Sequence, residues 1–199
     1  MKKEREESHL YMDVKVVTED TYRSYGGIDL TAWDQASSKY FRVLRKSTLQ
    51  QLAERVGEGM NCDPKRIRFW NMVNRQNKTN RPDLPTNDLS MTVESVQQKA
   101  IASKNAELRL WAEVAEEVDE NGSPIWPAHQ PGKTQAGIIS RSDLIVVFLK
   151  HFDVDHQTLS GAGHLYIKRE KKVEDLGHAI IEKMRWPKDT QLKLFEVIT

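Results

Sequence analysis

The chain has 199 residues, of which 38% are apolar and 30% charged, and its formal net charge at pH 7 is +1. The near-neutral charge gives no bulk electrostatic reason to bind nucleic acid or an anionic membrane, and the length fits one or two domains with modest cores. The single cysteine, Cys62, excludes a disulfide framework, and the longest aliphatic run, residues 144–149, is too short to span a bilayer, so we expect a soluble protein of a reducing intracellular compartment.

The N-terminal segment combines a charged run with a strand pattern. Residues 2–7 (KKEREE) favour either the end of a helix or a solvated leader, and they lack the apolar core of a secretory signal. Apolar and polar side chains alternate in residues 9–18, which predicts a first strand with one face on a core. Residues 19–39 are rich in Gly, Ser, Asp and Thr and predict a long connection.

A strand, a capped helix and a second strand are predicted next. Residues 40–45 alternate as a strand does. Ser47 occupies the N-cap position and Gln50 lies three residues on, which matches a capping box. The helix that follows this cap carries one apolar stripe at helical spacing, formed by Leu49, Leu52, Ala53 and Val56. Residues 67–73 are then predicted to form the second apolar strand.

A loop, a short helix and a closing strand follow. Residues 74–90 are polar and broken by Pro82 and Pro85, which predicts a loop. Residues 91–101 show apolar helical spacing, and alternation in residues 106–115 predicts the closing strand.

A linker and a shorter set of elements complete the chain. Residues 116–142 open with acidic side chains and hold three prolines, which favours an extended linker, and we expect Trp126 to pin it onto a domain. The elements predicted afterwards are strands at 143–152 and 164–170, a helix at 171–185 and a strand at 191–198. Residues 143–152 are apolar on both faces of their strand. Because nothing follows Thr199, we expect a final strand to be missing and a sheet position to be open.

An internal repeat organises these elements. Residues 40–60 align without gaps to residues 164–184, and each copy runs through a proline into another apolar strand. A duplicated strand–helix–strand unit predicts two similar small domains. It also favours binding or spacing over chemistry built on one central pocket.

The repeated unit resembles ubiquitin. Residues 41–70 (FRVLRKSTLQQLAERVGEGMNCDPKRIRFW) place a strand, a capped helix, an Asp–Pro turn and an Arg-flanked strand in ubiquitin's order, and residues 107–114 (ELRLWAEV) are similar to its last strand. We therefore expect an α+β fold of two tandem ubiquitin-like β-grasp domains, the second without its final strand. The expected boundaries are a charged connecting helix end at 1–8, a first domain at 9–117, a Pro-containing linker at 118–142 and an incomplete second domain at 143–199.

A narrower resemblance covers nearly the whole chain. The segments REESHLYMDVKVV, RIRFWNMVNRQNKTNRP and DLIVVFLKHFD are similar to the region that follows the catalytic domain in the herpesvirus-associated ubiquitin-specific protease family. The most characteristic pieces are HLYM at 9–12 and a loop at 75–82. In that loop the family-characteristic, structural residues are Arg75, Asn77, Thr79, Arg81 and Pro82.

This resemblance implies a non-catalytic ubiquitin-like region of a deubiquitinase, a thiol protease of the nucleus and cytoplasm. The region is expected to dock protein substrates and regulators and to support its own catalytic domain. It is expected to be monomeric, to need no cofactor or metal, and to bind neither nucleic acid nor membrane. In the family, the second domain binds lysine-containing peptides through an acidic segment, and here only Glu196 matches an acidic position beside it. The family's catalytic Cys and His motifs are absent from this sequence.

Two other features have both a functional and a structural interpretation. Cys62 could be a nucleophile, but no histidine lies nearby in sequence and its repeat partner is Trp186, so a packing role is favoured. Residues 151–156 (HFDVDH) could bind a metal ion. Aspartates are common at strand-to-turn junctions, however, and no second cluster supplies the remaining ligands of a zinc site.

A basic stretch offers a rival function. Lys and Arg residues between 65 and 81, interleaved with Phe69 and Trp70, could suit nucleic acid. The favoured interpretation is a solvated strand face with one aromatic side chain in the core. The rival to a docking region is therefore an independent adaptor with duplicated ubiquitin-like folds that binds protein or nucleic acid, and a free-standing enzyme is a weaker rival.

Overall fold

The structure, a computed structural model, describes residues 7–74, 79–100, 107–127, 132–133, 139–140 and 144–196. The N-terminal elements are η1 (Ser8–Leu10), β1 (Tyr11–Val17), α2 (Glu19–Ser24), β2 (Lys39–Leu44), α3 (Leu49–Met60), η2 (Pro64–Arg66), β3 (Ile67–Asn74), β4 (Asn80–Thr86), α4 (Val93–Ala100) and β5 (Leu108–Val114). The later elements are β6 (Glu117–Val118), β7 (Pro124–Ile125), β8 (Gly132–Lys133), β9 (Ile139–Ser140), β10 (Leu144–Asp153), β11 (Thr158–Lys168) and α5 (Val173–Met184). The protein is therefore of the α+β class, as predicted. Among the described residues no helix is long and apolar enough to cross a membrane.

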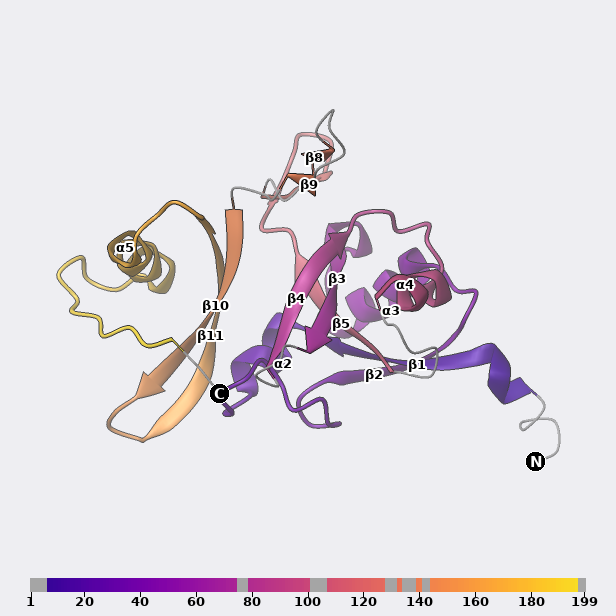
Figure 1. Ribbon diagram of the computed structural model, residues 1–199, viewed down its shortest axis with the longest axis horizontal. Helices are drawn as coiled ribbons and strands as arrows, with labels where there is room; N and C mark the ends of the chain where they lie inside the picture. The colour runs from indigo at the N-terminus through magenta and orange to yellow at the C-terminus, as the bar shows by residue number, and fades with distance from the viewer. Residues whose placement is uncertain are drawn as a thin grey trace.

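Five strands form the main sheet, in the order β2-β1-β5-β3-β4. Strands β1 and β5 run parallel, with Val14 opposite Leu108, and the other neighbouring pairs are antiparallel. Helices α3 and α4 cover one face of this sheet (Figure 1). This arrangement is compatible with a β-grasp fold. We refer to residues 11–114 as the N-terminal module and to the face of the main sheet away from α3 as its outer face.

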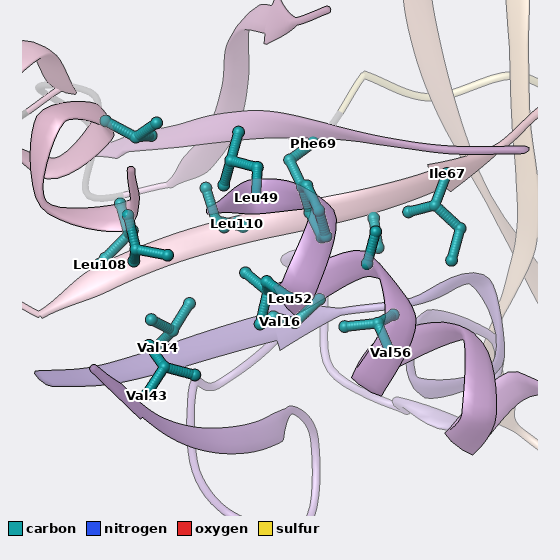
Figure 2. Packing of buried hydrophobic residues seen from close by; sticks show 14 of the residues in the cluster. Val14, Val16, Val43, Leu49, Leu52, Val56, Ile67, Phe69, Leu108 and Leu110 are labelled. Atoms are coloured by element: carbon teal, nitrogen blue, oxygen red, sulfur yellow. The ribbon is translucent and has the colours of Figure 1, made fainter. Parts of the chain in front are cut away.

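The core of the N-terminal module lies between α3 and the main sheet. The predicted apolar stripe of the helix is buried, at 1% exposure or less for each of its four residues. Figure 2 shows three residues of the stripe, Leu49, Leu52 and Val56, in the same cluster as Val16 of β1, Phe69 of β3 and Leu110 of β5. Burial of such side chains contributes ~1.5–3 kcal/mol each, so this layer is the main source of stability in the module.

The predicted start of helix α3 was wrong by one residue. The N-cap is Thr48, whose side chain accepts a hydrogen bond from the Gln51 amide, and the Gln51 side chain bonds back to the Thr48 amide. Ser47 belongs to the preceding turn, since its amide donates to the Leu44 carbonyl at 2.9 Å and its carbonyl accepts from Val93. The capping-box prediction was correct in kind and shifted in register.

Two segments expected to be irregular contain regular structure. The connection at 19–39 begins with helix α2, because Thr18 caps it through a reciprocal pair of bonds with Thr21. The predicted loop at 74–90 contains strand β4 despite Pro82 and Pro85. Prolines are tolerated there because β4 is the last strand of the main sheet, and its pairing with β3 is irregular between Trp70 and Met72.

Residues 144–196, which we call the C-terminal unit, consist of the long antiparallel hairpin β10–β11 and helix α5 (Figure 1). Figure 1 shows the hairpin between α5 and the N-terminal module. A small core under α5 is formed by Leu149, Ala162 and Ile180, with Leu192 packed against it. The prediction of a strand at 191–198 was wrong for its described part, because residues 191–196 form no strand. Phe195 in this segment is 77% exposed. An alternating sequence forms a strand only where a neighbouring strand pairs with its backbone, and residues 191–196 have no such pairing.

Candidate functional site

The described part of the family-characteristic loop holds the segment between α2 and β2 in place. Residues 75–78, which include Arg75 and Asn77, lie outside the described part. Arg81 forms an ion pair with Asp29 at 2.8 Å, and the backbone amide of Asn80 donates to the same carboxylate at 2.9 Å. Thr79 is 2% exposed and Pro82 lies in β4 opposite Met72. These contacts fasten the segment between α2 and β2 onto the edge of the main sheet.

Three other candidate positions have simple surroundings. Glu196 is exposed near the end of the described chain. Cys62 packs partly buried against the core of the N-terminal module, and burial raises the pKa of its thiol, whereas a nucleophile needs a lowered one. Asp153 accepts hydrogen bonds from the amides of Asp155 and His156, so its carboxylate stabilises the turn at the hairpin tip. Among the described residues, no group of three or more His, Cys, Asp or Glu side chains could hold a metal ion.

The basic stretch is not the solvated strand face that its pattern suggested. Arg68 is 2% exposed and forms an ion pair with Glu113 of β5 at 2.6 Å between Nε and Oε2. Phe69 lies in the core, as expected for one aromatic, but Trp70 is also buried, on the outer face. Arg66 donates from its guanidinium to the Ala115 carbonyl. Arg68 therefore cannot reach a nucleic acid in this arrangement.

These outward side chains belong to a contact that we call the joint, between the hairpin β10–β11 on one side and the outer face and helix α2 on the other. Its aromatic centre stacks edge to face, with the Trp111 and Phe148 ring centroids 4.7 Å apart and those of Tyr22 and Phe148 5.5 Å apart. Trp70 and Trp111 are each 1% exposed. The joint thus buries aromatic surface between the N-terminal module and the C-terminal unit.

Glu113 is the polar centre of the joint. Its carboxylate accepts hydrogen bonds from Arg68, from the Trp70 indole N–H and from the Tyr166 hydroxyl, the last at 2.6 Å. His164 Nε2 lies 3.6 Å from Glu113 Oε1. Burial alone would raise the pKa of the Glu113 carboxyl, but the donors, led by His164 and Arg68, hold it at about 2. One charged carboxylate therefore connects β3 and β5 to strand β11.

His164 lies between two carboxylates. Its Nδ1 is 3.2 Å from Glu19 Oε2 of helix α2, and its Nε2 faces Glu113. Burial opposes protonation of the imidazole, but the adjacent carboxylates of Glu113 and Glu19 raise its pKa to about 8. A cleft of about 230 Å³ beside His164 is lined by Arg23, Arg66 and Lys183, among others.

Helix α2 and strand β11 approach closely. The irregular pairing between Leu149 and Lys150 falls opposite Gly161–Gly163, and a Cβ on Gly161 would lie 2.5 Å from the Tyr22 carbonyl oxygen. The Tyr22 hydroxyl donates to the Leu149 carbonyl, and Lys150 Nζ donates to the Tyr25 carbonyl at 2.7 Å. Glycine in β11 is thus required for the contact with α2.

The segment after β5 is held against the same joint. It contains the short pair β6–β7. The Arg68 guanidinium lies over the Trp126 ring, with its Cζ atom 4.2 Å from the ring centroid. The prediction that Trp126 pins this segment onto a domain is confirmed. The joint itself was not predicted, although a signal existed: Arg68 and Trp70 on β3, like Trp111 and Glu113 on β5, alternate with core residues and must point outward.

Comparisons with known proteins agree with the resemblance found in the sequence. Ubiquitin carboxyl-terminal hydrolase 5 of Schizosaccharomyces pombe is 29% identical over 202 residues, covering 99% of this chain and 17% of that relative. Ubiquitin C-terminal hydrolase 13 of Arabidopsis thaliana is 28% identical over 201 residues, which cover 99% of this chain and 17% of that relative. Ubiquitin carboxyl-terminal hydrolase 7 of Drosophila melanogaster is 24% identical over 196 residues, with 98% and 16% covered. The chain thus spans 17% or less of the length of these relatives. The family model of the ICP0-binding domain of Ubiquitin-specific protease 7 matches residues 67–199, more than half of the sequence, so the chain belongs to that family of ubiquitin-specific protease regions.

Proposed function

We propose that this chain is a non-catalytic docking region of a ubiquitin-specific cysteine protease. It binds protein substrates or regulators and supports the activity of the catalytic domain, in the nucleus and cytoplasm. The family description names a binding domain, which supports docking of proteins, and the relatives are ubiquitin hydrolases many times longer than this chain. The N-terminal module would be a first ubiquitin-like domain and the C-terminal unit part of a second.

The joint is the observation that carries this proposal. Its buried carboxylate and aromatic rings connect the two parts rather than forming an open reactive centre, since Arg68 and Glu113 are each 3% exposed in their side chains. Cys62 lies apart from it, packed on the opposite, core side of the main sheet. A fixed pair of modules presents partners with one continuous surface, in which charged rims steer association and a few apolar side chains anchor it.

The experiment is a binding titration of the purified chain by fluorescence anisotropy at physiological salt. Labelled lysine-containing peptides should bind, and Glu196→Gln should weaken that binding more than the matched exposed control Glu120→Gln. Labelled duplex DNA should bind only weakly. Sub-micromolar, steeply salt-dependent DNA binding without peptide binding would favour the independent adaptor instead. Hydrolysis of a fluorogenic ubiquitin substrate that depends on Cys62 would contradict the non-catalytic assignment.

A further inference from the structure

We propose that the joint is a proton-dependent latch, in which the protonated imidazole of His164 holds the hairpin β10–β11 against helix α2 and the main sheet. Each ring nitrogen of His164 faces a carboxylate, Glu19 at 3.2 Å and Glu113 at 3.6 Å. A neutral imidazole has one N–H and presents a lone pair to one of the two carboxylates, whereas the imidazolium donates to Glu19 and directs its second N–H toward Glu113 in an ion pair. The two-sided contact therefore selects the charged ring.

The proton on His164 places a positive charge directly between the carboxylates of Glu19 and Glu113. Arg68 neutralises Glu113 through its 2.6 Å ion pair, and the imidazolium offsets Glu19. Loss of the proton removes the cation nearest to Glu19 inside this largely buried contact and leaves that carboxylate with only the exposed Arg23, which is unfavourable. Several titratable and charged groups face His164 or its cleft, and they come from every element packed around it. They are Glu19 and Arg23 of α2, Arg66 of η2, Arg68 of β3, Glu113 of β5, Glu116 after β5, Tyr166 of β11 and Lys183 of α5.

The other cations have partners of their own. Arg23 pairs with Glu19 along helix α2 at 3.4 Å, but its side chain is 56% exposed and screened by water. Lys183 pairs with Glu116 at 3.5 Å. Arg66 donates to the Ala115 carbonyl. None of them replaces a donor that lies between Glu19 and Glu113.

The latch acts on the joint and not on either core. His164 is on the C-terminal unit and both of its carboxylate partners are on the N-terminal module, so its contacts bridge the two parts. It belongs to neither of the apolar clusters under α3 and α5. The cleft beside it gives water access for proton exchange. The carboxylates raise the pKa of His164 to about 8, so the latch is closed at neutral pH and opens as the pH rises through that value.

The test combines an NMR titration of the histidine rings with ¹⁵N relaxation of the intact chain between pH 6.5 and 9. His164 should titrate with a pKa of about 8, and the rotational correlation times of the two parts should be equal at pH 6.5 and diverge at pH 9. His164→Gln should show diverging times at every pH, whereas His178→Gln should behave as the wild type. Glu19→Gln, which leaves the buried Glu113 in place, should lower the opening midpoint by about one pH unit.

Two results would overturn the latch. One is a His164 ring whose pKa is not raised above the ordinary value for histidine of about 6.5. The other is equal correlation times that persist at pH 9 and in His164→Gln, which would show that the remaining contacts of the joint hold it without His164.

Discussion

Replacing Glu113 with glutamine removes the charge at the centre of the joint while keeping its size. The Arg68 guanidinium, 3% exposed, is then left without a counter-charge. Breaking a buried ion pair by removing one partner costs ~3–5 kcal/mol. Because the carbonyl of the substituted amide side chain can still accept one or two of the original hydrogen bonds, we expect about 3 kcal/mol. That is a large share of the ~5–15 kcal/mol that stabilises a typical domain.

Urea unfolding followed by circular dichroism measures this loss. Glu117→Gln, an exposed position on β6, serves as the control and should change stability by less than ~0.5 kcal/mol. Adding Arg68→Met to Glu113→Gln removes the orphaned cation and should recover part of the loss, since paired removal of buried charges is often nearly neutral. A Glu113→Gln cost below ~1 kcal/mol, or no recovery in the double variant, would refute the assignment of Glu113 as the charged centre of the joint.

Three further predictions concern the joint, its pH dependence and the helix cap. Gly161→Ala should lower the melting temperature because the new Cβ meets the Tyr22 carbonyl, at a cost of ~1–3 kcal/mol, whereas Gly177→Ala on α5, with no atom within 4 Å of its Cβ, should be neutral or stabilising; equal effects would contradict the close approach of α2 and β11. The pKa of His164 is raised, so its contribution of up to ~2 kcal/mol is complete below pH 6.5 and lost as the pH rises through about 8. Burial lowers the pKa of Lys150 to about 8, so the contribution of this lysine to stability changes with pH in the opposite direction. The difference in unfolding free energy between wild type and His164→Gln, measured at pH 6.5 and at pH 9, isolates the histidine. A difference that does not depend on pH would count against its role. Thr48→Ala should cost ~1 kcal/mol in urea unfolding and Ser47→Ala less, because Thr48 is the cap of α3; the reverse order would restore the sequence-based prediction.

Local patterns in the sequence were sufficient for the core of the N-terminal module. The stripe on α3 and the alternation in β1 and β5 predicted which side chains face this core, because periodicity alone fixes the face on which each side chain lies. The same reasoning missed α2, since a short capped helix inside a Gly- and Ser-rich segment has little apolar periodicity to reveal it. It missed β4 because prolines mark a loop unless the strand lies at a sheet edge.

The joint could be anticipated only in part. The apolar character of β10 on both faces was recognised, and the structure explains it: Leu149 faces the small core under α5, while Phe148 faces the joint. The partner surface was not identified, because Arg68 and Glu113 look like ordinary solvent-facing residues of alternating strands. Their burial depends on a contact between segments about 100 residues apart, as in the Arg68–Tyr166 bond with its separation of 98. Sequence alternation gives the direction of a side chain but not what covers it.

The most direct test of the docking role compares a full-length ubiquitin-specific protease carrying this region with the same protein lacking it. The measurement is kcat/KM for a ubiquitin-conjugated protein substrate and for a small fluorogenic ubiquitin substrate. We predict that deletion reduces turnover of the protein substrate at least about tenfold more than that of the small substrate, which corresponds to ~1.4 kcal/mol of lost binding. Equal reductions for both substrates, or none for either, would contradict a docking function.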